Sequence, residues 1–312
     1  MHNDRWFGPY YIRKRLNKIP AMFSTFEETT SSYARLKPIF IIGSIRSGNT
    51  MLRAMLVSGG ELVIPPESFV LRDVIRKFRL HGYLPWEDLV KVILAEFATE
   101  RMFPDWNVSI ARAYERAVAV EESQRSLAAI VDALYAEYAI SACGQARRWG
   151  DKTPLNHRAL HWINRVFPGA QFVHILRDGR DAVASTLDAG IYTTPEAAAQ
   201  RWVEAVMACR RFGDTKGTHQ FLEVRYEELV TDPNKTLARV CGFAGLRFDE
   251  SMLDFHKNAG SLGDTYQAHH ANVSRPVSSS SIGQWRARLT DAQVAAMMPV
   301  IEGTLSKVGY GD

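Results

Sequence analysis

The sequence lacks three features that would each define a class of protein. Its three cysteines, Cys143, Cys209 and Cys241, are widely spaced and form no C-x-x-C pair. An odd number at this spacing argues against a disulfide framework or a cysteine metal site, and it predicts a reducing, cytoplasmic location. No apolar run reaches about 18 residues, so no transmembrane helix is predicted. Residues 1–20 carry charge but lack the apolar centre of a secretory signal.

Strong charge of either sign is also missing. The formal net charge is +4, and 46% of the 312 residues are apolar, which is ordinary for a soluble globular protein. Such a balance suits an anionic ligand without demanding nucleic acid, and we predict no nucleic-acid partner. The basic and aromatic residues 1–20 allow peripheral contact with a membrane surface, but packing on the main domain is the favoured interpretation.

Strand and helix patterns alternate along most of the chain. No repeat or long linker divides it, so we predict an N-terminal extension over residues 1–36 and one domain over 37–312. Strands are expected at 38–42, 171–176 and 220–224, with weaker candidates at 62–64 and 148–150. Helices are expected at 50–57, 69–79, 86–100, 126–142, 156–166, 181–189, 195–212 and 234–243. This alternation predicts an α/β fold, a parallel sheet with helices on both faces, and ligands beyond the carboxyl ends of its strands.

The stretch "FIIGSIRSGNTMLRAML" joins the first strand to the first helix through a phosphate loop (P-loop) of the form G-x-x-x-x-G-K-[ST], with Asn49 in the lysine position. Gly43 and Gly48 let the backbone curl, and the amides from Ser47 to Met51 would face an anion at the helix start. Without the lysine, the loop lacks the group that contacts a γ-phosphate, and no convincing Walker B aspartate follows another strand. The alternative is an ordinary glycine-containing strand–helix turn.

A second loop follows the strand expected at 171–176. "FVHILRDGRDAVAS" places Arg177 at the strand end and Ser185 eight residues later on the next helix. A guanidinium fork and a hydroxyl at this spacing could bind one anion together, which suggests a second phosphate site. Alternatively, Arg177 and Arg180 form salt bridges with Asp178 and Asp181.

Together the two loops resemble those of sulfotransferases that use 3′-phosphoadenosine 5′-phosphosulfate (PAPS). "GSIRSGNT" is similar to their 5′-phosphosulfate loop, and "RDGRDAVAS" to their 3′-phosphate motif. Further similar segments are "WGDKTP", "VRYEELVTDP" and "RPVSSSSIGQW". The resemblance spans about residues 39–289 and is nearest in pattern to the tyrosylprotein sulfotransferases and related bacterial enzymes. It implies a P-loop-type α/β domain and a donor without a γ-phosphate, used without a metal, so that a lysine at Asn49 is unnecessary.

The resemblance also implies roles for individual residues. Arg46 would stabilise charge on the bridging oxygen as the sulfuryl group leaves, and Lys152 would approach that group. The residues that would cradle the 5′-phosphosulfate with Arg46 are Ser47, Gly48, Asn49, Thr50 and Met51. Arg177 and Ser185 would bind the 3′-phosphate. The other residues placed at the nucleotide are Tyr226, Ser280, Ser281 and Trp285.

Two residues are candidates for the general base. Cytosolic small-molecule sulfotransferases carry a histidine two residues after the lysine, where this chain has Pro154. The tyrosylprotein branch implies instead a glutamate soon after the first helix, and Glu67 in "VIPPESFVLRDVIRK" matches it. A carboxylate there would take the acceptor's hydroxyl proton as the oxygen attacks sulfur in line. Glu67 could instead cap the helix expected from Phe69, and His157 is the rival base or an exposed helix residue.

The acceptor is left open between a protein tyrosine, a sugar, a lipid and a small molecule. We expect residues 80–148 to shape its pocket, and the basic stretch "RRWGDKTPLNHR" favours an acidic acceptor. Two other functions remain: a P-loop kinase, which does not explain the missing lysine, and a non-catalytic nucleotide-binding scaffold, which does not explain why Arg46, Lys152 and Glu67 occur together. The oligomeric state is open, a dimer included.

Overall fold

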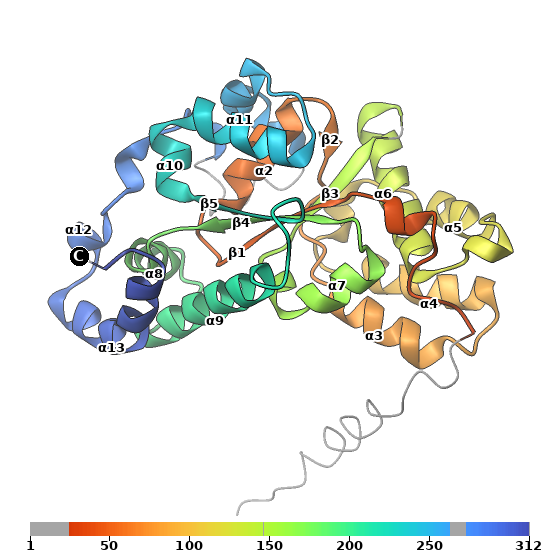
Figure 1. Ribbon diagram of the computed structural model, residues 1–312, viewed down its shortest axis with the longest axis horizontal. Coiled ribbons are helices and arrows are strands. Elements are labelled where there is room, and N and C mark those ends of the chain that lie inside the picture. Colours follow the sequence, from red (N-terminus) through yellow and green to blue (C-terminus); the bar gives the residue numbers. More distant parts are fainter. Residues whose placement is uncertain (1–24, 146, 263–272, 312) are drawn as a thin grey trace, which may run out of the picture.

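A parallel sheet of five strands forms the centre of the part that the computed structural model describes, residues 25–145, 147–262 and 273–311 (Figure 1). The strands are β1 (Ile39–Gly43), β2 (Leu62–Val63), β3 (Arg148–Lys152), β4 (Gln171–Leu176) and β5 (Phe221–Arg225). Their order is β2-β3-β1-β4-β5, and every pairing is parallel. The predicted α/β fold with a parallel sheet is therefore confirmed, and the strands' carboxyl ends share one edge.

Helices cover both faces of this sheet (Figure 1). They are α2 (Asn49–Ser58), α3 (Leu71–His81), α4 (Trp86–Ala98), α5 (Ile110–Val118), α6 (Leu127–Cys143), α7 (Leu160–Val166), α8 (Gly179–Asp188), α9 (Pro195–Gly213), α10 (Tyr226–Thr231), α11 (Pro233–Ala244), α12 (Trp285–Arg288) and α13 (Asp291–Lys307). Short 3₁₀ segments include η4 (Pro154–Arg158), η5 (Glu250–Leu262) and η7 (Ser279–Ser281). In Figure 1, α2, α10 and α11 lie on one side of the sheet, and α7 and α9 on the other.

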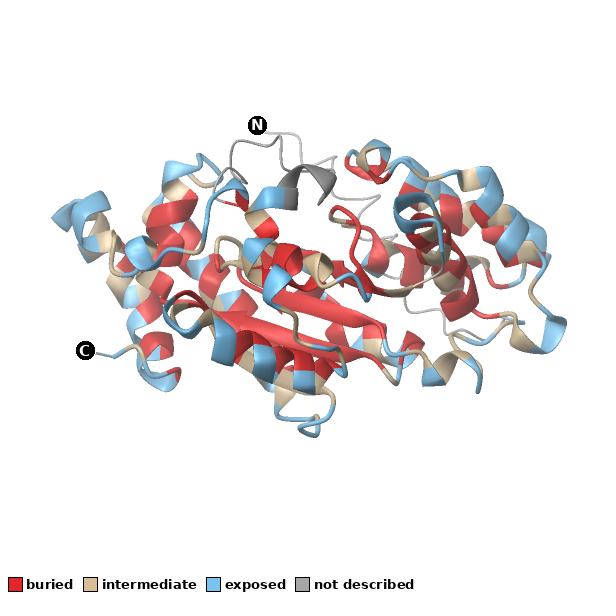
Figure 2. Ribbon diagram, turned by 90° about the horizontal axis from the view of Figure 1, so that it is seen from above, coloured by how far each residue is buried: buried red, intermediate tan, exposed pale blue. Residues whose placement is uncertain are grey.

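The side chains of β1 show why both faces need cover. Ile39 and Ile41 belong to the apolar cluster that includes residues of α2, α10 and α11, whereas Phe40 and Ile42 belong to the cluster with α3 to α7. Successive side chains of a strand point to opposite faces, so an uninterrupted apolar run requires helices on both. All four side chains are fully buried, and burying each contributes about 1.5–3 kcal/mol. Figure 2 shows the strands buried and the outer helix faces exposed.

The structure differs from the predicted elements at three places that matter for function. Strand β3 continues to Lys152, two residues beyond its predicted end, because Asp151 and Lys152 pair with Phe40 and Ile41 of β1. The helix predicted from Phe69 begins at Leu71 instead. The helix predicted over 156–166 is divided into η4 and α7 at Ala159, whose ψ of 15° with φ of −135° is not helical. Helices α5, α10, α12 and α13 were not predicted.

The described part of the predicted N-terminal extension, residues 25–36, packs against the domain. The Thr25 backbone N–H donates to the Gly82 carbonyl at 3.0 Å, and Glu28 forms ion pairs with Arg79 and Arg165. Residues 1–24, for which membrane contact was considered, lie outside the described residues. In the described part of the chain, no helix combines the length and the apolar character needed to cross a bilayer.

Candidate active site

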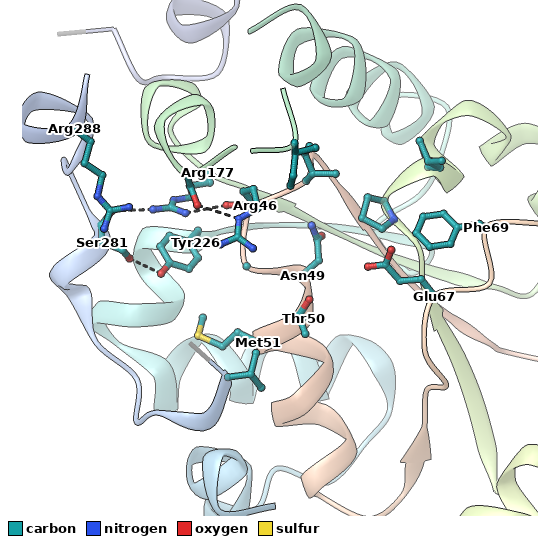
Figure 3. A pocket seen from close by; sticks show the side chains of 17 residues that line it. Arg46, Asn49, Thr50, Met51, Glu67, Phe69, Arg177, Tyr226, Ser281 and Arg288 are labelled. Carbon is teal, nitrogen blue, oxygen red and sulfur yellow. Dashed lines mark hydrogen bonds between the residues drawn. The ribbon is translucent and has the colours of Figure 1, made fainter. Parts of the chain in front are cut away.

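A cavity of about 280 Å³ opens beyond the carboxyl ends of β1 and β4. Its described lining comes from the P-loop and from later segments of the chain: Ile45, Arg46, Gly48, Asn49, Thr50, Met51, Glu67, Phe69, Pro154, Leu155, Arg177, Ser185, Ile191, Tyr226, Val273, Ser281 and Arg288. Figure 3 shows the arginines, Tyr226 and Ser281 at one end, and Glu67 and Phe69 at the other. The P-loop side chains stand between the two ends, so the cavity has a cationic side and a carboxylate side.

The P-loop has the conformation that its glycines predict. Gly48 has a φ of 96°, and a Cβ there would lie 2.5 Å from a ring carbon of Tyr226, so a larger residue would not fit. Helix α2 begins at Asn49, which brings the backbone N–H groups of its first turn to the cavity. The Asn49 side-chain amide donates to the Ser44 carbonyl at 2.7 Å. The residue that replaces the P-loop lysine therefore holds the loop itself.

The two predicted anion-binding loops meet at the cationic end. Arg46 Nε donates to Ser185 Oγ at 3.0 Å. Arg177 donates to the carbonyls of Arg46 and Ser281, both at 2.8 Å, and its guanidinium lies 4.5 Å from the centre of the Tyr226 ring. Arg177 thus forms neither of the salt bridges considered for it, whereas Arg180 does pair with Asp178, at 2.9 Å.

Electrostatics at this end favour an anion. Burial lowers the pKa of the Arg46 guanidinium, and the positive charge of the adjacent Arg177 lowers it further. Two buried polar atoms, Arg177 Nε and Ser47 Oγ, have no hydrogen-bond partner in the described structure. A hydrogen bond between Tyr226 Oη and Ser281 Oγ, which are 2.6 Å apart, connects η7 to α10. A bound phosphate or sulfate would neutralise the arginines and could satisfy the unpaired atoms.

Arg288 was not among the predicted site residues, yet it lines the cavity. It pairs with Asp188 at 3.1 Å, which fixes α12 against the end of α8. The sequence signal that could have identified Arg288 is the run "WRAR", which begins at the last residue of the similar segment "RPVSSSSIGQW". Arg288 lies three residues beyond Trp285.

Two predicted nucleotide residues are not brought to the cavity. Ser280 is exposed, and its N–H and hydroxyl interact with Ser278. The Trp285 ring lies within 5 Å of the guanidinium groups of Arg180 and Arg286. The cause is Asp181, which accepts hydrogen bonds from the backbone N–H groups of Gly283 and Trp285 and thereby fixes the start of α12 at the first turn of α8. Ser281, between them, does line the cavity.

Glu67 and Lys152 form an ion pair at the opposite end. Glu67 lines the cavity with 15% of its side chain exposed, whereas the Lys152 side chain is fully buried and does not line it. The alternative in which Glu67 caps a helix is wrong, because Val70 occupies the N-cap of α3 and no side chain caps it. Lys152 contacts Glu67 here, so its predicted contact with a sulfuryl group would require a shift of its ammonium.

A buried hydrogen-bond network around Asp151 fixes this ion pair. The Asp151 carboxylate accepts from Tyr135 Oη at 2.7 Å, Ser68 Oγ at 2.9 Å and Asn156 Nδ2 at 2.6 Å. The Ser68 N–H donates to Thr153 Oγ1 at 3.0 Å. Because Ser68 follows Glu67 and Asp151 precedes Lys152, the network holds both members of the pair. Burial raises the pKa of Asp151, and these donors oppose that rise.

His157, the rival base, lies outside the lining of the cavity. It is 6% exposed, which contradicts the expected exposed position, and its Nδ1 lies 2.6 Å from the Pro154 carbonyl. Burial lowers the pKa of His157 to about 4, and the charges of Arg201 and Arg158 act in the same direction. Because Glu67 lines the cavity and His157 does not, the geometry favours Glu67 as the base.

The lowered pKa makes a prediction about stability. The folded state binds the His157 proton less readily than the unfolded state does. The contribution of His157 to stability is therefore present above pH 6.5 and is lost as pH falls towards 4. We expect the protonation of His157 to lower the free energy of unfolding by about 2 kcal/mol between pH 7 and pH 5. Urea unfolding at both pH values should show a smaller acid loss in His157→Gln than in the wild type. His219→Gln, at an exposed histidine, is the control and should keep the wild-type loss.

Two sets of residues expected to shape the acceptor pocket do not do so in the described part of the chain. None of residues 80–148 lines the cavity, because α4, α5 and α6 pack into the core beside β3. The basic side chains of the stretch "RRWGDKTPLNHR" do not line it either, although Pro154 and Leu155 within it do. Arg148 stands at the amino end of β3, where it donates to the carbonyls of Lys37 and Ala244, and Arg147 donates to the Gly60 carbonyl. Arg148 and Lys152 are about 13 Å apart along β3, so the charge of Arg148 lies far from Lys152.

Comparison with known proteins agrees with this geometry. The sequence profile of the sulfotransferase family matches residues 38–250, about two thirds of the chain. The chain belongs to the sulfotransferase family. The match includes the P-loop, Glu67, Lys152 and the arginine-bearing loop after β4. The resemblance inferred from the motifs is confirmed, and with it the classification of the chain as a sulfotransferase.

Its relatives are distant. Protein-tyrosine sulfotransferase A of Caenorhabditis elegans is 23% identical to this sulfotransferase. The alignment covers 97% of this chain and 78% of the Caenorhabditis elegans protein. Nodulation protein NoeE of Sinorhizobium fredii is 24% identical over 87% of this chain and 65% of its own. Among solved structures, the sulfotransferase domain of the Synechococcus PCC 7002 olefin synthase has a TM-score of 0.60 at 22% identity, covering 86% of this chain and 95% of the domain. The profile match establishes the family, and the structural likeness shows the fold.

Proposed function

We propose that this sulfotransferase moves the sulfuryl group of PAPS to the hydroxyl of an acceptor. One observation carries the proposal: Arg46, Arg177 and Ser185 converge at one end of the cavity whose other end holds Glu67. The first end suits the two anionic groups of the donor. The second offers a carboxylate to the acceptor, and one cavity holds both.

The residues present fit the donor. Arg177 and Ser185 would receive the 3′-phosphate, and the unpaired Arg177 Nε is one donor available to it. The amides at the start of α2 and Ser47 Oγ would receive the 5′-phosphosulfate. Two observations support this placement: the absence of a side chain at Gly48 lets Tyr226 pack against the P-loop, and both residues line the cavity.

The chemistry then follows from the two ends of the cavity. PAPS supplies an electrophilic sulfur and a phosphate leaving group. Glu67 accepts the acceptor's hydroxyl proton as the new oxygen–sulfur bond forms, and Lys152 keeps the Glu67 carboxylate in place. As the bond from sulfur to the bridging oxygen breaks, Arg46 stabilises the charge that develops on that oxygen.

The role of Arg177 can be tested by calorimetry. Arg177→Ala should weaken binding of adenosine 3′,5′-bisphosphate by about 1.5–3 kcal/mol, the usual contribution of a charge-assisted hydrogen bond. Affinity for adenosine 5′-monophosphate should hardly change, because that ligand has no 3′-phosphate. Arg158→Ala removes a guanidinium outside the cavity and should leave both affinities unchanged. Equal losses for the two ligands would show that Arg177 does not bind the 3′-phosphate.

The kinase alternative predicts a different ligand preference. A P-loop kinase binds ATP with magnesium through the lysine that Asn49 replaces. In a thermal-shift measurement we expect adenosine 3′,5′-bisphosphate to raise the melting temperature more than ATP with magnesium at the same concentration. The reverse order would favour phosphoryl transfer.

A further inference from the structure

The carboxylate end of the cavity is apolar. Phe69, Pro154 and Leu155 line it in the segments that also carry Glu67 and Lys152. Phe69 lies two residues after Glu67, and Pro154 and Leu155 begin the turn of η4 after β3. Figure 3 shows Phe69 beside Glu67, away from the arginines. An acceptor whose hydroxyl reached Glu67 would therefore lie against hydrocarbon.

Two of the apolar lining residues are exposed to an unusual degree. Leu155 is 37% exposed and Ile191 is 44% exposed, and both line this one cavity although they come from different segments. Single exposed apolar side chains are common on proteins, but two on the rim of a functional cavity leave apolar area for a ligand to bury. The rim thus favours a ligand with an apolar body.

The backbone at Phe69 indicates that this end of the cavity is functional. Its φ of 54° lies in the left-handed region, which an aromatic residue rarely adopts because of the contact between its Cβ and the backbone. The Asp151 network holds the neighbouring Ser68, so the fold maintains this conformation. Backbone strain of this kind concentrates at functional sites, and here it accompanies a half-buried ring on the cavity wall.

The charges near Glu67 argue against an anionic acceptor. The cationic lining residues in the described part of the chain are Arg46, Arg177 and Arg288, all grouped at the donor end in Figure 3. The ammonium of Lys152 is buried against Glu67. An acidic acceptor would place a negative charge near the Glu67 carboxylate, with no described lining cation beside it. Like charges close together repel. A sugar would place several hydroxyls against Phe69, Pro154 and Leu155, which offer no side-chain hydrogen-bonding groups.

We propose that the acceptor is an uncharged alcohol or phenol with an apolar body. Its hydroxyl donates to Glu67, and its hydrocarbon lies against Phe69 and Leu155 and reaches the rim. The proposal rests on the proposed function, since it takes Glu67 as the base and the arginine end as the donor site. It separates this sulfotransferase from one built for acidic tyrosyl peptides or carbohydrates.

Transfer from radiolabelled PAPS to a panel of acceptors tests the proposal. The panel is 2-naphthol and 1-decanol, an acidic tyrosyl peptide, and a chitin oligosaccharide. We expect kcat/KM for the apolar compounds to exceed that for the peptide and the sugar by at least about ten-fold, the effect of burying roughly one large apolar side chain's worth of surface. Calorimetry with 2-naphthol and the complex of the enzyme with adenosine 3′,5′-bisphosphate gives a second readout, independent of turnover.

A pair of variants gives the matched control. Leu155→Lys puts a charge on the rim and should lower kcat/KM for 2-naphthol about ten-fold, with the KM for PAPS unchanged. Leu80→Lys makes the same change at a leucine of similar exposure, 39%, outside the cavity, and should leave both values unchanged. Faster transfer to the peptide or the sugar overturns this inference but leaves the proposed function intact. The inference is also overturned if the enzyme binds adenosine 3′,5′-bisphosphate but neither binds 2-naphthol nor transfers the sulfuryl group to 2-naphthol or 1-decanol. Failure to bind adenosine 3′,5′-bisphosphate overturns the proposed function itself.

Discussion

Replacing Glu67 with glutamine is expected to lower kcat by at least about a hundred-fold, the usual contribution of a positioned general base. Glutamine keeps the size of the side chain and its place on the cavity wall, but it cannot accept the hydroxyl proton. Affinity for adenosine 3′,5′-bisphosphate should stay close to wild type, because the arginines that bind it stand at the other end. Steady-state kinetics and calorimetry measure the two quantities separately.

The ion pair adds a stability effect that needs a control. In Glu67→Gln the fully buried Lys152 ammonium loses its counter-ion, and breaking a buried pair costs about 3–5 kcal/mol, less here because Glu67 is partly exposed. The double variant Glu67→Gln with Lys152→Met removes the unpaired charge, so we expect it to regain stability without regaining activity. Recovery of the melting temperature with kcat still low would separate chemistry from folding.

Two further variants bear on the same base. Aspartate at position 67 holds its carboxylate roughly 1.5 Å shorter, the length of one C–C bond, so Glu67→Asp should also be slow if proton transfer needs the present geometry. If Glu67→Gln instead turned over normally while His157→Ala lost activity, the base assignment would pass to His157. Its position outside the cavity lining makes that result unexpected.

Replacing Arg46 with alanine should lower kcat by on the order of 10²-fold to 10³-fold, as when one oxyanion stabiliser is removed. Arg46 lies in the cavity at the P-loop, and its Nε already donates to Ser185 across it. Arg46→Lys retains a positive charge without the guanidinium fork, so it should recover part of the rate. Arg286→Ala, at an exposed arginine outside the described lining, serves as the control.

Folding should survive these changes at Arg46, which is a loop residue. The same expectation fails for Lys152, because it stands on β3 with its side chain fully buried, so truncation to alanine would open a cavity as well as unpair Glu67. Lys152→Met is therefore the variant that tests its role. A variant at either position that kept most of its turnover would remove that residue from the mechanism.

The sequence by itself determined the sheet, the P-loop and the family. The run of four apolar residues in β1 requires cover on both faces, and the glycines at positions 43 and 48 fit a backbone that curls around an anion. These signals are local, since strand periodicity and glycine's freedom act over a few residues. For the same reason Arg177 and Ser185 could be paired from their spacing on one loop and the helix that follows it.

Only the tertiary structure decided which groups meet. The Arg46 guanidinium reaches Ser185, 139 residues away, and the Lys152 ammonium pairs with Glu67, 85 residues away. The structure also placed Ser280 and Trp285 off the cavity lining, brought Arg288 to it, and turned Arg148 away from it. No periodicity encodes these outcomes, because they depend on the order of strands in the sheet and on the packing of helices around it. That arrangement separates the cationic end of the cavity from its apolar end, and it assigns Glu67 to the second.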